Sequence, residues 1–149
     1  MACPVFPLLT AGYEGRTTDE FIAVLKQEKV AVVADVRQLP LSRRRGFSKS
    51  ALATFLPLNG IQYVSLRELG TPVAVRKQYR MTGSFEELAR QYLAYVATVD
   101  DSVESLYQMA VAKPCCLLCY ERDPKQCHRS LLALVLAGRN GHQFVVRHL

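Results

Sequence analysis

One short stretch constrains the fold of this chain more than any other. Residues 115–120 form an apolar run behind Pro114, which is the pattern of a strand buried on both faces of a sheet. After a charged loop, the chain is apolar almost all the way round a predicted helix that ends near Ala137, so this helix is also expected to be buried. A strand hidden on both faces needs helices on both sides of its sheet, and this requirement predicts an α/β fold.

Four further apolar runs of strand length alternate with helical patterns along the chain. The predicted strands cover residues 5–10, 30–36, 61–66 and 143–146, and the predicted helices cover residues 17–28, 48–56, 85–96 and 103–110. This alternation predicts a three-layer α/β/α domain with a mostly parallel sheet of about five strands. No linker interrupts it, so residues 1–149 are expected to form a single domain. Residues 69–84 contain glycines, a proline and basic side chains but few apolar ones, and are expected to form a long surface loop.

The composition indicates a cytoplasmic protein with anionic partners. The chain has 5 cysteines, an odd number that includes the adjacent Cys115 and Cys116, which favours free thiols in a reducing compartment. Its start lacks the features of a signal peptide, and no run reaches the roughly 20 apolar residues of a membrane-spanning helix. The net charge of +6 favours anionic partners, nucleic acid among them, although a solvated basic surface explains the charge as well.

Polar side chains follow three of the predicted strands, and ligands of parallel α/β sheets sit beyond the carboxyl ends of the strands. These side chains are Tyr13 and Glu14 after the first strand, Asp35 and Arg37 at the end of the second, and Glu121 with the turn at residues 127–129 after the fourth. We expect them to converge on one site. Asp123 and Pro124 offer one start for the next helix and Cys127 another, and either start places Cys127 near the positive helix end, which favours a thiolate.

These residues, in this order, resemble the family catalogued as domain of unknown function 488. The matching motifs are Thr10-Ala11-Gly12-Tyr13, Asp35-Val36-Arg37 with Pro40 and Ser42-Arg43, Gly60-Ile61-Gln62-Tyr63, Leu69-Gly70-Thr71, and Cys119-Tyr120-Glu121 leading to Cys127-His128-Arg129. Ala11 and Thr71 depart from the family's pattern, which usually has Ile and a second Gly there. The resemblance covers nearly the whole chain. It implies a compact α/β domain with a shared polar site, and it brings no established activity.

The arginines are expected to bind an anion, because each presents a planar fork of donors that matches phosphate or carboxylate. We assign this role to Arg37, Arg43 and Arg129, together with free amides at the helix start. The alternative interpretation is structural, with Asp35 or Glu121 neutralising these arginines in salt bridges.

Glu121 is expected to act as a general acid or base, either alone or paired with Glu14 in cleaving a glycosidic bond of a nucleotide. Cys127 is the second candidate catalytic residue, as a nucleophile with His128 or Glu121 as its base. Neighbouring side chains on a helix point about 100° apart, which places His128 poorly for that task, and a packed thiol is the structural alternative. The residues expected to position the substrate are Tyr13, Asp35 and His128.

Metal binding is a further possibility for this part of the chain. Cys119, Cys127 and His128 offer the thiolate and imidazole groups that suit zinc. The sequence has no Cys-x-x-Cys pair, and Cys115 and Cys116 point to opposite faces of a strand. We therefore predict no metal site, although the sequence alone does not decide whether Cys119, Cys127 and His128 bind a metal. No cofactor can be named.

Two functions therefore follow from the sequence. The favoured one is a small enzyme, a hydrolase or a transferase, that acts on a phosphorylated or nucleotide-like molecule. The alternative is a non-catalytic nucleic-acid-binding domain, in which Arg43-Arg44-Arg45 contact phosphates and Phe47 stacks on a base. The oligomeric state stays open.

Overall fold

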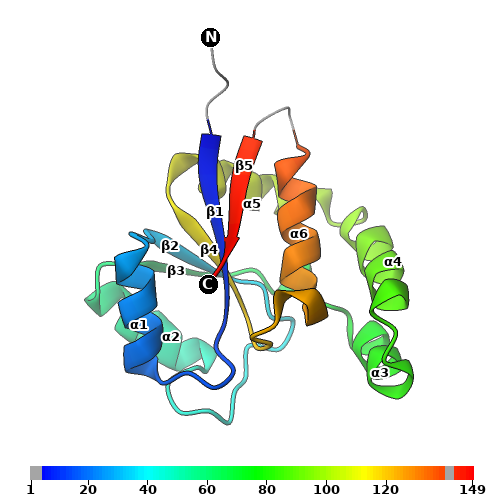
Figure 1. Ribbon diagram of the computed structural model, residues 1–149, viewed down its shortest axis with the longest axis horizontal. Coiled ribbons are helices and arrows are strands. Elements are labelled where there is room, and N and C mark those ends of the chain that lie inside the picture. Colours follow the sequence, from blue (N-terminus) through cyan, green and yellow to red (C-terminus); the bar gives the residue numbers. More distant parts are fainter. Residues whose placement is uncertain (1–4, 140–142) are drawn as a thin grey trace.

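The computed structural model describes residues 5–139 and 143–149. Strands and helices alternate (Figure 1). The strands are β1 Val5–Gly12, β2 Val32–Asp35, β3 Gln62–Ser65, β4 Cys115–Cys119 and β5 Gln143–His148. The α-helices are α1 Thr18–Gln27, α2 Lys49–Leu58, α3 Val73–Thr82, α4 Phe85–Val96, α5 Asp100–Ala112 and α6 His128–Ala137. None of the helices within these ranges is long and apolar enough to cross a membrane.

The strands form one parallel sheet in the order β3-β2-β4-β1-β5. On one face, α1 and α2 contribute Phe21 and Leu52 to an apolar core. On the other face, α4, α5 and α6 contribute Tyr92, Leu106 and Leu132 to a second core (Figure 1). The three-layer α/β/α prediction is confirmed, because every residue of β4 is buried between these two helix layers.

The strand order brings the polar strand ends together. Strand β4 pairs with β1 on one side, where Cys119 is in register with Gly12, and with β2 on the other, where Leu118 is in register with Asp35. The three strand ends that carry polar side chains are therefore direct neighbours at one edge of the sheet.

The prediction of a long loop over residues 69–84 is wrong, because most of this segment is the helix α3. No residue of α3 is buried and most of its side chains are polar, so its few apolar side chains did not suggest a helix. Its ends do carry a signal, since Pro72 is the N-cap and Gly83 ends the helix in the left-handed conformation with a φ of 67°. Helix α3 packs on α4 at the periphery of the molecule (Figure 1).

Helix α6 takes the later of its two predicted starts. The Asp123 side chain accepts a hydrogen bond from the Lys125 amide and caps a short 3-10 turn, Pro124–Gln126. Cys127 is then the N-cap of α6, with an extended backbone, and His128 is the first helical residue. The chain therefore bends at Cys127, so the Cys127 and His128 side chains are not spaced as neighbours within a helix.

Candidate functional site

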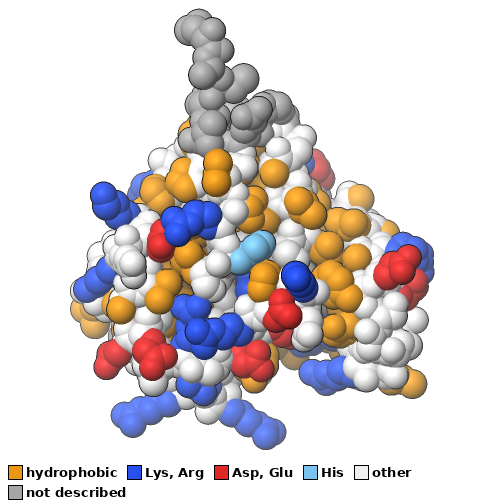
Figure 2. All heavy atoms as spheres, in the orientation of Figure 1, with side chains coloured by type: hydrophobic (Ala, Val, Ile, Leu, Met, Phe, Trp, Pro, Cys, Tyr) orange, Lys and Arg blue, Asp and Glu red, His pale blue; other side chains and the backbone are white. Residues whose placement is uncertain are grey.

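A cleft of about 670 Å³ lies beyond the carboxyl ends of β1, β2 and β4. Six of the eight residues that the sequence assigned to the site line it, namely Tyr13, Arg37, Arg43, Glu121, Cys127 and His128. Asp35 and Arg129 lie behind its wall. Figure 2 shows Lys and Arg side chains gathered on the lower part of the molecule, the side toward which the strands run in the same view of Figure 1.

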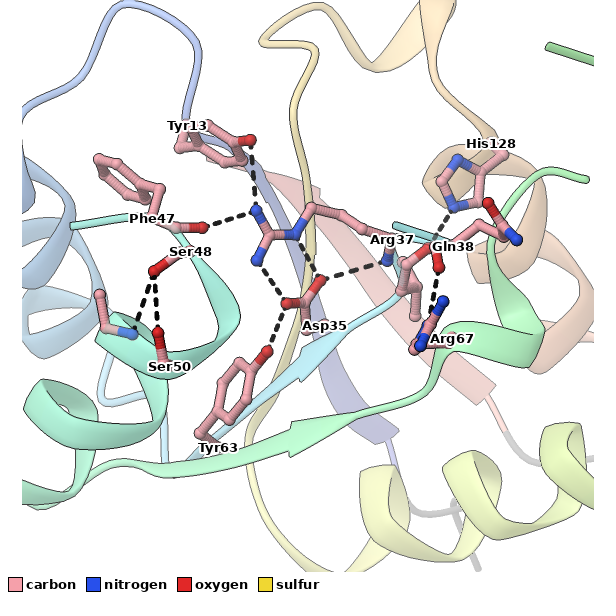
Figure 3. Close-up of polar contacts among 12 residues, drawn as sticks. Tyr13, Asp35, Arg37, Gln38, Phe47, Ser48, Ser50, Tyr63, Arg67 and His128 are labelled. Atoms are coloured by element: carbon pink, nitrogen blue, oxygen red, sulfur yellow. Dashed lines mark hydrogen bonds and ion pairs between the residues drawn. The ribbon is translucent and has the colours of Figure 1, made fainter. Parts of the chain in front are cut away.

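Arg37 is held in a buried ion pair (Figure 3). Its Nε and Nη2 donate to the two carboxylate oxygens of Asp35 at 2.8 and 2.6 Å, and its Nη1 donates to Tyr13 Oη and the Phe47 carbonyl at 3.2 and 2.7 Å. Tyr63 Oη also donates to Asp35, at 2.5 Å. Burial lowers the pKa of Arg37, but the bonds to Asp35 outweigh it and raise the pKa overall. Most donors of Arg37 are therefore committed to the protein.

Arg129 is the largest of the fully buried side chains, with 0% exposed. Its guanidinium donates to the backbone carbonyls of Glu121 and Arg122, which lie in the loop after β4. Arg129 thus fixes the loop that carries Glu121, and it does not line the cleft.

Other arginines face the cleft with their charge uncompensated. Arg43, Arg76 and Arg80 line it, and no carboxylate in the described ranges lies within 4.0 Å of their guanidinium nitrogens. Arg76 Nη2 donates to the Gln38 side chain at 3.1 Å, and its buried Nε has no partner. Arg76 and Arg80 were missed by the sequence reasoning because they belong to α3, the helix expected to be a loop.

Sulfur, nitrogen and oxygen atoms cluster at the end of β4. The sulfur atoms of Cys119 and Cys127 lie 3.7 and 3.8 Å from Nδ1 of His128. The Cys119 thiol donates to Glu121 Oε2 at 3.2 Å. Nε2 of His128 donates to the Val36 carbonyl at 2.7 Å, so Nδ1 is the ring nitrogen that faces the sulfurs. The interpretation that His128 is poorly placed beside Cys127 is wrong, because the bend at the N-cap brings the two groups together.

The ionisable groups of this cluster shift one another's pKa values. Burial raises the pKa of Glu121, and the negative charge of Cys127 raises it further. Burial also raises the pKa of Cys127, but its interactions with Cys119 and His128 outweigh the burial and lower the pKa overall. The pKa of His128 is raised in turn, since Cys127 opposes the effect of burial. Within the cluster, negative charge is therefore favoured on Cys127 over Cys119.

Glu14 does not pair with Glu121 across the cleft. Its exposed carboxylate instead accepts a hydrogen bond from the Arg122 amide at 3.2 Å, outside the cleft lining. Among the described residues, Glu121 is the one carboxylate that lines the cleft.

Close backbone packing holds the loops around the cleft. A Cβ atom on Gly12 would lie 1.8 Å from the Glu121 carbonyl oxygen, and one on Gly70 would lie 2.1 Å from the Gln38 amide nitrogen. Both glycines belong to motifs that carried the resemblance. The absence of a side chain at these two positions is what lets the loops that bear Tyr13, Glu121 and Gln38 approach one another.

A match to a family model shows which protein family the chain belongs to. The family is described as Domain of unknown function DUF488, and its model matches residues 17–136. The chain belongs to this family. The DUF488 match takes in most of the cleft, from Arg37 to His128, while Tyr13 lies just before it. No curated protein and no solved structure is significantly similar to the chain. The DUF488 description names no activity, so the function must be argued from the site.

Proposed function

We propose that this DUF488 protein is a small cytoplasmic enzyme that binds a phosphorylated or nucleotide-like molecule in the cleft and uses Glu121 as an acid–base group. One observation carries the proposal: Arg43, Arg76 and Arg80 face the same cleft as Glu121 without carboxylate partners. The four cysteines in the described ranges are free thiols, as the cytoplasm would keep them.

Arg76 is the centre of the anion site in this proposal. Its side chain is half-buried and held at one nitrogen by Gln38, which leaves a fixed fork with an unsatisfied buried Nε. A buried donor without a partner costs free energy, and a bound phosphate oxygen would remove that cost. Arg43 and Arg80 are exposed and add charge at the rim of the cleft. The sequence assigned Arg37 and Arg129 to the anion, but in this proposal they stabilise the loops that form the walls of the cleft.

Aromatic side chains support a nucleotide-like substrate. Tyr13, Tyr79 and Tyr120 line the cleft, and Tyr120 is 47% exposed although it packs edge-on against Tyr13. Leu41, which is 75% exposed, lies on the same lining. The exposed ring of Tyr120 offers a flat surface of the kind that binds the face of a base, while arginines hold the phosphate. Tyr13 is 3% exposed and stacks on Phe47, so it supports Tyr120.

Glu121 is the group proposed to move the proton. It lines the same cleft as the arginines and accepts a hydrogen bond from the buried Cys119 thiol, and Arg129 fixes its backbone. A carboxyl group next to a bound anion can protonate a leaving group or activate a nucleophile, which fits hydrolysis or group transfer. Tyr13 and His128 belong to the lining of the same cleft and would position the substrate.

A thermal-shift panel tests the binding half of the proposal. Wild type, Arg76→Met and Arg90→Met are heated with nucleoside phosphates, sugar phosphates, inorganic phosphate or single-stranded DNA. Arg90 is the control, because it is exposed on α4 and paired with Glu87 outside the cleft. A small phosphorylated molecule should raise the melting temperature of wild type and Arg90→Met but not of Arg76→Met, since a ligand of the folded state stabilises it by mass action.

Two other outcomes decide against the proposal. A shift produced by DNA alone, equal in all three proteins and abolished by salt, would favour the non-catalytic nucleic-acid-binding domain. With a ligand in hand, Glu121→Gln should still bind it but lose its turnover. Full turnover by Glu121→Gln would remove the acid–base role.

A further inference from the structure

We propose that Cys119, Cys127 and His128 bind a zinc ion, with one coordination position left open toward the cleft beside Glu121. Their sulfur atoms and Nδ1 all lie within 4.8 Å of one another, and all three residues are buried. The binding of zinc stands on this geometry alone. Its use in a reaction rests on the proposed function.

Two of the three separations in the cluster, those between each sulfur and Nδ1, are close to the distances between corners of a zinc tetrahedron. Zinc bonds of about 2.3 Å to sulfur and about 2.0 Å to nitrogen place neighbouring corners about 3.5–3.8 Å apart. The two sulfur-to-Nδ1 distances are 3.7 and 3.8 Å. An ion between the three atoms would therefore need movements of a few tenths of an ångström at Nδ1, and a modest approach of the two sulfurs.

The histidine is already oriented as a ligand. Its Nε2–H donates to the Val36 carbonyl, which leaves Nδ1 directed at both sulfurs. Ligating histidines usually donate their other ring nitrogen in this way, because the bond fixes the ring and its tautomer. The edge of the ring also packs against Tyr92, a fully buried side chain, so the ring cannot swing out of the cluster without disturbing the core.

The donor set and its access favour zinc at an open site. Two thiolates and an imidazole are soft and borderline ligands that suit zinc over calcium or magnesium. Zinc sites with three protein ligands keep a position for water or substrate, whereas closed structural sites have four. All three ligands line the cleft, and Glu121 Oε2 lies 3.2 Å from Cys119 Sγ on the same lining.

The sequence has no Cys-x-x-Cys pair, in which one short loop supplies two ligands, but the fold brings ligands together from two separate elements. Here Cys119 comes from the end of β4, while Cys127 and His128 come from the N-cap and first residue of α6. The bend at Cys127 turns two adjacent residues toward one point.

Direct metal binding tests the proposal. Wild type is stripped with a chelator, desalted, and titrated with zinc in competition with a chromophoric chelator, and cobalt(II) is used as a spectroscopic substitute. We expect one ion per chain, with thiolate-to-cobalt charge-transfer bands and tetrahedral visible bands. Cys127→Ser and His128→Gln should each weaken zinc binding at least about 100-fold. Wild type that binds no zinc, or gives an octahedral cobalt spectrum without charge-transfer bands, would overturn the proposal.

Matched controls separate ligand loss from misfolding. Cys116→Ala removes a buried thiol of β4 outside the cluster, and His148→Gln removes an imidazole that bonds Thr10 on β1. Both should bind zinc as wild type does, and unchanged affinity in Cys127→Ser would also refute the site. Arg76→Met should keep its zinc and lose phosphate binding. Zinc binding without any phosphorylated ligand would thus end the proposed function alone, and the reverse result would end the zinc site alone.

Discussion

The buried ion pair between Asp35 and Arg37 gives a sharp prediction about stability. The two side chains are 0% and 6% exposed, and the carboxylate of Asp35 accepts bonds from the Arg37 backbone, the Arg37 guanidinium and Tyr63. Asp35→Asn keeps the shape of the side chain but removes its charge and turns one acceptor into a donor that faces the guanidinium. Arg37 then remains buried with its positive charge unpaired.

The expected loss is large. Removing one partner of a buried ion pair typically costs about 3–5 kcal/mol, because the other charge stays desolvated. For a chain of this length each kcal/mol lowers the melting temperature by about 2–4 °C, so Asp35→Asn should melt about 6–20 °C below wild type. Equilibrium urea unfolding, followed by circular dichroism, should show an earlier midpoint with an unchanged slope.

Two comparison variants make the test specific. Asp100 pairs with Arg139, but its side chain is 65% exposed, so Asp100→Asn should unfold close to wild type. The double variant Asp35→Leu, Arg37→Met removes both charges and should be more stable than Asp35→Asn. An Asp35→Asn protein whose free energy of unfolding lies within about 1 kcal/mol of wild type would refute the reasoning, since a buried guanidinium that loses its counter-charge should destabilise the fold by more than that.

Three further substitutions test the walls of the cleft. Gly12→Ala should destabilise the protein by about 1–3 kcal/mol or more in urea unfolding, because its Cβ would lie 1.8 Å from the Glu121 carbonyl oxygen, whereas Gly138→Ala, with 3.7 Å to its nearest atom, should be neutral. Arg129→Met should lose about 1–3 kcal/mol for each loop carbonyl left unpaired and speed hydrogen exchange in that loop, and unchanged exchange would contradict its anchoring role. Tyr63→Phe should cost about 1.5–3 kcal/mol, the worth of its bond to the buried carboxylate, and a neutral result would mean that this bond is absent in solution.

The sheet and its helix layers follow from local patterns in the sequence. The run 115–119 is apolar at every position because both of its faces are covered, and the helix predicted over residues 17–28 begins with a capping box at Thr17. Helix α3 was not predicted, because it buries no residue and its sequence is mostly polar. Arg76 and Arg80 went unnoticed with it.

The site was predicted in part, for reasons that the contacts make clear. The strand ends identified Tyr13, Glu121 and Cys127 as neighbours, because the carboxyl ends of parallel strands share an edge. The salt bridge of Arg37 follows the structural interpretation, because Asp35 lies two residues before it and pairs with it. The carbonyls that hold Arg129 could not be predicted, because they depend on how the loop folds back.

The central claim is that an anion sits against Arg76 in the cleft, and the arginine Nε–H resonances report on this directly. Wild type is titrated with the best phosphorylated ligand from the thermal-shift panel, or with pyrophosphate if several perform equally, and the resonances are assigned by substitution. The account predicts a saturable shift of the Arg76 Nε–H, which lacks a partner in the free protein, with Arg90 unmoved. A titration in which Arg76 stays still, or in which all exposed arginines drift together without saturating, would contradict it.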